Sequence, residues 1–266
     1  MDLGIKGKWA LVGGASKGLG FGCAKALVLE GVNVCIVARN EGPLKEAIAA
    51  LKALNSAVAV LGVAADITTA QGREAVWGVP SGPGKDYDIV VTNAGGPPPG
   101  DFRNWSRDDW VRALDANMLT PIELIKATVD KMAERGFGRI INITSGSVKA
   151  PIDNLGLSNG ARSGLTGFVA GLARTEKMAG NNVTINNLLP GAFDTDRIRE
   201  TMKGMVEKSG KSMEEVAQMR VKTIPSGRFG NTDEFGSTCA FLCSQHASYI
   251  TGQNILIDGG AYKGTH

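Results

Sequence analysis

A chain of 266 residues, 43% of them hydrophobic and 21% charged, is long enough to bury a sizeable core and too apolar for intrinsic disorder. Its net charge of +3 is small and its lysines and arginines are scattered, which excludes the strongly basic surfaces of nucleic-acid-binding and membrane-surface proteins. Without an apolar signal segment or an apolar run of membrane-spanning length, we expect a cytoplasmic protein with no membrane partner.

The segment from Lys8 to Arg39 has the pattern of a strand, a glycine-rich turn, a helix and a second strand. Glycines in the turn allow the backbone to bend tightly and to approach a phosphate group, and the helix N-terminus favours the negative charge. The alternative is a tight turn without a ligand. The position of the turn between a strand and a helix favours a dinucleotide-binding site instead. The predicted site residues are Gly14, Ser16, Lys17, Gly18, Leu19 and Gly20.

The residues after the second strand indicate which dinucleotide is bound. An acidic residue there would hold the ribose hydroxyls of NAD, whereas this chain has Arg39 followed by Asn40. Arg39, together with Lys17 of the turn, would pair with the 2′-phosphate of NADP, so NADP(H) is the predicted cofactor. Two solvated surface cations are the alternative.

Helices and strands alternate along the rest of the chain. Helical spacing covers 43–55, 71–79, 105–114, 120–134, 158–179 and 232–243, and strand patterns cover 57–64, 88–92, 139–143, 183–189 and 254–257. With the first two strands this gives seven, which predicts an α/β fold: a doubly wound parallel sheet in a single domain. Loops at 94–101, 144–157 and 190–213 follow carboxyl ends of strands, where ligands bind in such sheets.

The four cysteines, at positions 23, 35, 239 and 243, lie mostly among apolar residues. This environment favours buried free thiols over a disulfide framework. With two histidines in the chain and none beside these thiols, no metal site is expected.

Motifs along nearly the whole chain resemble those of the short-chain dehydrogenase/reductase family. The glycine turn is similar to that family's Thr-Gly-x-x-x-Gly-x-Gly, with Gly13 in place of Thr, and the tail from Tyr249 to Gly260 is similar to its C-terminal end. The resemblance implies an adenine contact at Asp66 and Ile67, a ribose-side turn at Asn93, Ala94 and Gly95, and a nicotinamide-side loop at Pro190, Gly191 and Thr195. It also implies that Asn117 is an active-site residue.

The catalytic centre departs from the family pattern. The family pairs a serine with Tyr-x-x-x-Lys, whose cation lowers the pKa of the phenol for proton transfer. Ser145 keeps the serine position, but Ser158 stands at the tyrosine position and Arg162 at the lysine position. Arg162 can hold a cofactor ribose and lend positive charge, while Asp153 and Lys149 are candidate proton carriers or merely solvated loop charges.

Three functions remain open from the sequence. The first is an NADP(H)-dependent oxidoreductase that acts on a keto or hydroxy group of a small or acyl-type substrate, with Asn117 ordering a water. The family resemblance suggests the 3-oxoacyl reductase kind. The second is a non-redox enzyme for elimination, isomerisation or hydrolysis in the same pocket. The third is a catalytically silent NADP(H)-binding subunit.

The segment 195–223 contains four methionines and is expected to form a lid over the substrate, or simply to pack as core. Helices over 120–134 and 158–179 resemble those through which the family assembles, so a homo-oligomer, a dimer or tetramer, is expected. Besides the cofactor, the expected ligand is a small-molecule substrate.

Overall fold

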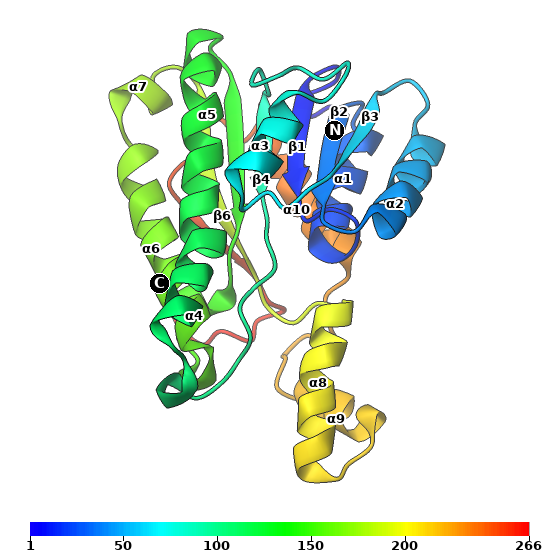
Figure 1. Ribbon diagram of the computed structural model, residues 1–266, viewed down its shortest axis with the longest axis vertical. Helices are drawn as coiled ribbons and strands as arrows, with labels where there is room; N and C mark the ends of the chain where they lie inside the picture. Colours follow the sequence, from blue (N-terminus) through cyan, green and yellow to red (C-terminus); the bar gives the residue numbers. More distant parts are fainter. Residues whose placement is uncertain (266) are drawn as a thin grey trace.

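Seven parallel strands form one sheet in the computed structural model, which describes residues 1–265 (Figure 1). Their order is β3-β2-β1-β4-β5-β6-β7 and every neighbouring pair is parallel, which confirms the predicted doubly wound sheet. The strands are β1 (Trp9–Gly13), β2 (Asn33–Ala38), β3 (Val60–Ala64), β4 (Ile89–Thr92), β5 (Gly138–Ile143), β6 (Val183–Pro190) and β7 (Asn254–Ile257).

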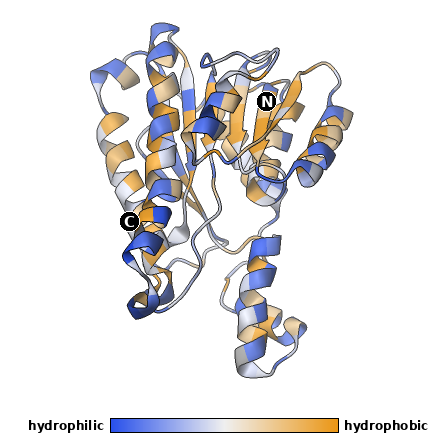
Figure 2. Ribbon diagram, in the orientation of Figure 1, coloured by the Kyte–Doolittle hydropathy of each residue, from blue (hydrophilic) through white to orange (hydrophobic). Residues whose placement is uncertain are grey.

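Helices cover both faces of the sheet. Side chains of β1 alternate between the two buried clusters: Ala10 and Val12 belong to one cluster with α1, α2 and α10, and Leu11 belongs to the other with α3, α5 and α6. Figure 2 shows hydrophobic residues on the strands and hydrophilic ones on the outer helix surfaces. The helices of this double layer are α1 (Gly18–Leu29), α2 (Glu41–Leu54), α3 (Ala70–Trp77), α4 (Arg107–Leu114), α5 (Thr120–Glu134), α6 (Gly156–Leu172), α7 (Glu176–Ala179) and α10 (Thr232–Cys243).

Two glycines allow α1 and α10 to pack with their backbones in contact. A Cβ on Gly22 would collide with the carbonyl oxygen of Thr232, and a Cβ on Gly236 would collide with the carbonyl oxygen of Gly22. The packing fixes the axis of α1 and therefore the direction in which its N-terminus points.

The predicted helix over 158–179 is interrupted. It forms α6, which starts at Gly156 and ends at Leu172, and the short α7 from Glu176. The backbone N–H of Thr175 donates to the carbonyl of Leu172 at 3.1 Å, and its hydroxyl donates to the same oxygen at 2.9 Å. These two bonds satisfy a carbonyl that a continuous helix would have paired with a later residue, so α6 ends there.

Two further predicted boundaries are shifted by local capping. The helix predicted from residue 105 begins at Arg107, because Ser106 and Asp109 form a capping box. The strand predicted from residue 57 begins at Val60, since the N–H of Ala57 is turned back onto the side chain of Asn55.

The segment 195–223, predicted as a lid, forms two helices, α8 (Asp196–Ser209) and α9 (Met213–Val221), so most of the predicted loop 190–213 is helical. These helices extend away from the sheet beyond the carboxyl ends of its strands (Figure 1). They have their own small apolar cluster of Ile198, Met202 and Val216, whereas Met205 and Met219 are exposed. This segment therefore packs mainly on itself.

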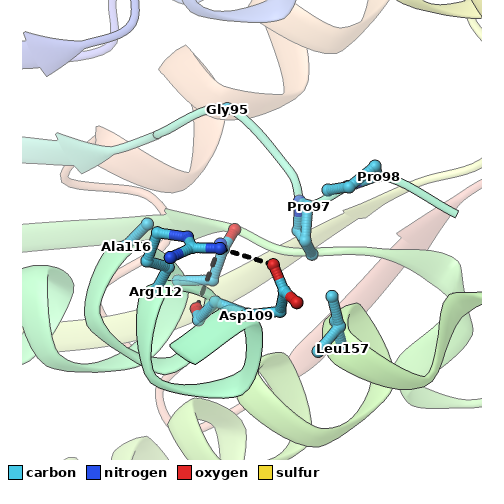
Figure 3. Close-up of a pocket in the computed structure, with 9 residues that line it drawn as sticks. Gly95, Pro97, Pro98, Asp109, Arg112, Ala116 and Leu157 are labelled. Carbon is cyan, nitrogen blue, oxygen red and sulfur yellow. Dashed lines mark hydrogen bonds and ion pairs between the residues drawn. The ribbon is translucent and has the colours of Figure 1, made fainter. Parts of the chain in front are cut away.

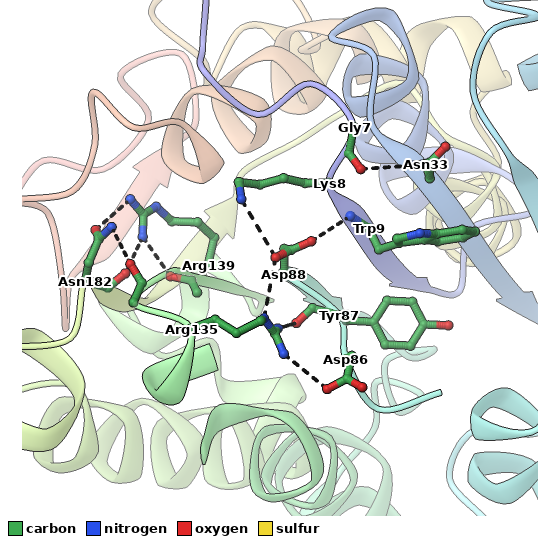
Figure 4. A network of polar contacts seen from close by, with 12 residues as sticks. Gly7, Lys8, Trp9, Asn33, Asp86, Tyr87, Asp88, Arg135, Arg139 and Asn182 are labelled. Atoms are coloured by element: carbon green, nitrogen blue, oxygen red, sulfur yellow. Dashed lines mark hydrogen bonds and ion pairs between the residues drawn. The ribbon is translucent and has the colours of Figure 1, made fainter. Parts of the chain in front are cut away.

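Ion pairs and hydrogen bonds tie together the amino ends of the strands (Figure 4). Asp88, just before β4, accepts a hydrogen bond from the N–H of Trp9 at 2.9 Å and lies 3.8 Å from the ammonium of Lys8. Arg135 pairs with Asp86 at 3.2 Å and with Asp88 at 3.9 Å. These contacts hold the amino ends of β1 and β4 together and attach the end of α5 to them.

A buried polar ladder crosses the sheet near the carboxyl ends of β4 and β5. Thr92 donates to Asn142 at 2.7 Å, Asn142 to Asn187 at 3.1 Å, and Asn187 to Asn254 at 2.8 Å. Each bond joins residues that face each other in the strand register, so the ladder fixes the relative positions of the loops that follow these strands.

All four cysteines are free and buried, as predicted. Among the described residues, no helix combines the length and the apolar character that a membrane crossing requires.

Candidate active site

The glycine turn (residues 13–20) is shaped by contacts that no side chain would allow. Gly14 and Gly18 have φ of +55° and +61°, in the left-handed region that favours glycine. A Cβ on Gly14 would lie 2.7 Å from Nδ2 of Asn93, and a Cβ on Gly20 would lie 2.9 Å from the same nitrogen. Asn93 in turn donates to the carbonyl oxygen of Gly14 at 3.2 Å.

The turn lies where the winding of the sheet reverses. β1 is flanked by β2 on one side and by β4 on the other, and Asn93 follows β4 directly. This crevice is where nucleotides bind in doubly wound sheets. The N-terminus of α1 has no side-chain cap and no acidic residue in its first turn, so its N–H groups remain available to an anion.

The start of α8 rests on the glycine turn. Cγ2 of Thr195 lies 3.7 Å from the position that a Cβ on Gly18 would take. The ammonium of Lys17 lies 2.8 Å from the carboxylate of Asp196, and this hydrogen-bonded pair raises the pKa of Lys17. Lys17, predicted to meet a phosphate, is thus paired with the first residue of α8 in this conformation.

The residues predicted for the adenosine side lie at the ends of β2 and β3. Arg39 and Asn40 are exposed directly after β2, and among the described residues neither side chain has a hydrogen bond or ion pair. Oδ1 of Asp66 accepts from the N–H and the hydroxyl of Thr68 at 3.0 and 2.8 Å, and Ile67 is buried beside it. The Asp66 carboxylate is thereby held in one orientation beyond the end of β3.

The loop after β4, which includes Ala94 and Gly95, borders a cavity of about 140 Å³ (Figure 3). Small-molecule sites are typically larger, about 300–1,000 Å³, so this cavity accommodates only part of a substrate. Arg112 and Asp109 form an ion pair at its wall. The lining residues are Gly95, Pro97, Pro98, Asp109, Arg112, Ala113, Ala116, Asn117 and Leu157.

Asn117 lies in a π-helical segment (Asp115–Leu119) that joins α4 to α5. π-Helical turns widen a helix locally and are frequent at functional sites. Asn117 is 5% exposed, and its Nδ2 donates to the carbonyl of Ala113 at 3.2 Å. Its side chain therefore hydrogen-bonds a backbone carbonyl of its own helix, which is the structural alternative to a catalytic role. Asn117 also lines the cavity.

Ser145 and Ser158 come from two elements in contact, since the 3₁₀ turn Gly146–Val148 packs against α6. The hydroxyl oxygen of Ser145 accepts from the N–H of Ser147 at 3.1 Å, so it caps this turn while remaining partly exposed. Ser158, in the first turn of α6, is buried at 7% exposure.

Arg162 lies one helical turn after Ser158 and is 8% exposed. Its Nη1 donates to the carbonyls of Ile143 and Thr144, both at 2.7 Å, which fixes the guanidinium at the end of β5. Burial, and secondly the positive charge of Arg197, lower the pKa of Arg162 to about 10. The group is therefore still protonated at neutral pH and cannot act as a base.

Arg197, the second residue of α8, was not predicted. Its Nη1 donates to the carbonyl of Gly96 at 3.0 Å and its Nη2 to that of Pro97 at 2.9 Å. These bonds tie α8 to the loop after β4. Nothing in the sequence marks this arginine, because its partners lie about a hundred positions away and are backbone groups.

The end of β6 completes the rim of the site. The N–H of Gly191 donates to the carbonyl of Ile257 at 2.8 Å, and a Cβ on Gly191 would collide with Asp258 at 2.6 Å. The carbonyl of Pro190 lies 3.4 Å from the Cβ position of Gly146, so this loop borders the one that carries Ser145.

The two charged loop residues considered as proton carriers differ in exposure. Lys149 is partly buried, whereas Asp153 is exposed and accepts from the N–H of Asn154 at 2.7 Å. The latter bond belongs to the short turn before α6 and leaves the carboxylate at the surface.

A family model described as enoyl-(acyl carrier protein) reductase matches residues 14–262. The dehydrogenase/reductase SDR family member 4 of Bos taurus is 30% identical, with 97% of this chain and 88% of that protein covered. The chain belongs to the short-chain dehydrogenase/reductase family. The 3-oxoacyl-[acyl-carrier-protein] reductase FabG of Salmonella typhimurium is 32% identical to this chain, and the match covers 98% of this chain and 99% of that protein.

The fold of this short-chain dehydrogenase/reductase is also found in solved structures. The L-sorbose reductase of Gluconobacter frateurii, crystallised with NADPH and L-sorbose, has a TM-score of 0.91 and 30% identity. The match covers 99% of this chain and 100% of the reductase, so no large insertion separates the two folds.

Proposed function

We propose that this protein is an NADP(H)-dependent oxidoreductase that acts on a keto or hydroxy group of a small or acyl-type substrate. The observation that carries the proposal is the glycine turn at the point where the winding of the sheet reverses. A side chain on Gly14 or Gly20 would collide with Asn93 there, so the turn needs glycine at both positions. The uncapped N-terminus of α1 suits a diphosphate there. FabG is named as a reductase, and the L-sorbose reductase structure contains NADPH, which supports a redox function.

The preference for NADP(H) over NAD(H) rests on Arg39. Its exposed guanidinium follows β2, where it is free to pair in a bidentate way with a 2′-phosphate. Lys17 would join it only by exchanging Asp196 for the phosphate. Asp66 and Ile67 would hold the adenine, Asn93, Ala94 and Gly95 the ribose side, and Pro190, Gly191 and Thr195 the nicotinamide side.

The catalytic centre is proposed to be non-standard. The bound cofactor would supply hydride chemistry, and the hydroxyl of Ser145 would donate a hydrogen bond to the substrate oxygen. Arg162 would place its positive charge near that oxygen, and Asn117 would order a water. A serine hydroxyl at 158 is a far weaker acid than a phenol of pKa about 10, so Ser158 would relay a proton rather than supply one.

The chain is further proposed to be one NADP-binding domain with a substrate lid at about 195–223. Two contacts support this. Asp196 pairs with Lys17 of the glycine turn, and Arg197 donates to backbone carbonyls of the loop after β4. Both would have to rearrange as ligands enter or leave, so cofactor binding should change amide hydrogen exchange in α8.

The direct test is titration with NADPH and NADH, followed by turnover with a panel of ketones and 3-oxoacyl thioesters. We expect tighter binding of NADPH and oxidation of NADPH with at least one ketone. Absence of binding by both cofactors would overturn the proposal. Cofactor binding with silence across the panel would favour the non-catalytic subunit, and substrate loss without a change in nicotinamide absorbance would favour the non-redox enzyme.

A further inference from the structure

Two guanidinium groups converge beside Gly96, in the loop after β4. Nη2 of Arg197 lies 3.1 Å from the position that a Cβ on Gly96 would take, and Nη2 of Arg162 lies 3.5 Å from the same point. One group comes from α6 and the other from the lid. The proposed lid therefore brings the charge of Arg197 close to the buried guanidinium of Arg162.

Neither charge is neutralised by a carboxylate within the described part of the chain, where no ion pair includes Arg162 or Arg197. Other cations around the site are paired: Lys17 with Asp196, Arg112 with Asp109, and Arg199 with Asp194. Burial is the main cause of the lowered pKa of Arg162, and repulsion by the nearby charge of the exposed Arg197 adds to it.

The buried guanidinium also has hydrogen-bonding capacity to spare. Nε of Arg162 is buried and has no partner among the described residues, and only its Nη1 is engaged with backbone carbonyls. A buried donor without an acceptor costs free energy, and a buried charge without a counterion costs more. An oxyanion beside Gly96 would accept from Nη2 of Arg162, which lies there, and would supply the missing counterion.

We propose that Arg162 and Arg197 together bind a carboxylate of the substrate next to its reacting carbonyl. This inference rests on the proposed function. Gly96 stands in the chain between Gly95, which is proposed to lie beside the cofactor, and Pro97, which lines the cavity. A planar carboxylate matches the fork of donors on each guanidinium. It would also compete with the carbonyls of Gly96 and Pro97 as an acceptor for Arg197, so substrate binding would be coupled to the contact between α8 and the loop after β4.

The diphosphate of the cofactor is the other source of an oxyanion, and the experiment separates the two. The probes are acetoacetate and levulinate, each compared with its methyl ester, which keeps the ketone and removes the charge. Binding of each probe to NADPH-loaded protein is measured by calorimetry, and NADPH affinity is measured separately for every variant.

Arg197→Gln removes the exposed member of the pair with little risk to folding, and Arg199→Gln, on the same helix, is the matched control. We expect the acids to bind more tightly than their esters, and Arg197→Gln to weaken acid binding roughly 10- to 100-fold. Ester binding, NADPH affinity and all properties of Arg199→Gln should stay unchanged. Arg162→Lys, which keeps the charge but loses the fork, should also reduce the preference for acids.

Equal binding of acids and esters, or failure of both acids to bind NADPH-loaded protein, would overturn the carboxylate site and leave the oxidoreductase proposal standing. A loss of NADPH affinity in Arg197→Gln, with acid binding unchanged relative to esters, would assign the pair to the cofactor and overturn it as well. Failure of the unaltered protein to bind NADPH would instead refute the proposed function.

Discussion

Replacing Gly20 by alanine isolates the contribution of the glycine turn to cofactor binding, and Gly42 provides a matched control in the first turn of the next helix. A Cβ at Gly20 would lie 2.9 Å from Nδ2 of Asn93, 3.0 Å from the carbonyl oxygen of Gly13 and closer still to that of Gly14. No atom lies within 4 Å of a Cβ at Gly42. The two substitutions therefore make the same chemical change in opposite steric surroundings.

The expected stability changes have opposite signs. Alanine is favoured over glycine within a helix by up to about 1 kcal/mol, so Gly42→Ala should be neutral or stabilising. At Gly20 the same gain is opposed by overpacking, which costs about 1–3 kcal/mol and here acts against backbone atoms that cannot rotate away. The net result is a loss of up to about 2 kcal/mol, and each kcal/mol lowers Tm by about 2–4 °C at this chain length.

Cofactor affinity should fall by more than stability does. Relieving the contact at Gly20 must widen the turn and move the N–H groups of α1 away from the diphosphate. We expect the Kd for NADPH, measured by calorimetry, to rise at least tenfold, or about 1.4 kcal/mol, in Gly20→Ala and to stay unchanged in Gly42→Ala. Unchanged NADPH affinity in folded Gly20→Ala would refute the assignment of this turn as the diphosphate site.

Three further predictions concern the centre, the cofactor and the assembly. Combining Ser158→Tyr with Arg162→Lys should raise the rate of ketone reduction by about 10²- to 10⁴-fold if a missing general acid limits it, and an unchanged kcat would contradict this. Arg39→Asp should reverse the preference for NADPH over NADH, as judged by the ratio of the Kd for NADPH to the Kd for NADH. An unchanged ratio would show that Arg39 is a solvated surface residue that does not contact the 2′-phosphate. Sedimentation velocity should show a dimer or tetramer, and a monomer at micromolar concentration would remove the expected homo-oligomer.

The glycine turn was predictable because its information is local. Positive φ at Gly14 and Gly18 restricts those positions to glycine, and the apolar runs on either side identify the flanking strand and helix. The parallel sheet followed from the same logic, since strands buried on both faces read as continuous apolar runs. Both features depend on residues that are close together in the chain.

The end of α6 and the role of Arg197 were not predictable for the opposite reason. Apolar spacing continues through the break near Thr175, and only the double bond to the carbonyl of Leu172 reveals that the helix stops. The contacts of Arg197 are with backbone carbonyls about a hundred residues away, so no side-chain pattern encodes them. Tertiary geometry supplies this information.

In the proposed centre, Ser158 and Arg162 take the places of the family's tyrosine and lysine, and this exchange would change what the centre can do. A guanidinium with a pKa of about 10 remains charged at neutral pH and cannot deliver its proton, and a serine hydroxyl is a weak acid. What Arg162 retains is a fixed positive charge with unused donors, which is suited to binding an anion rather than to moving a proton. A substrate carboxylate held there would place the carbonyl by electrostatic attraction, and the proton would then have to come from water or from a group on the substrate itself.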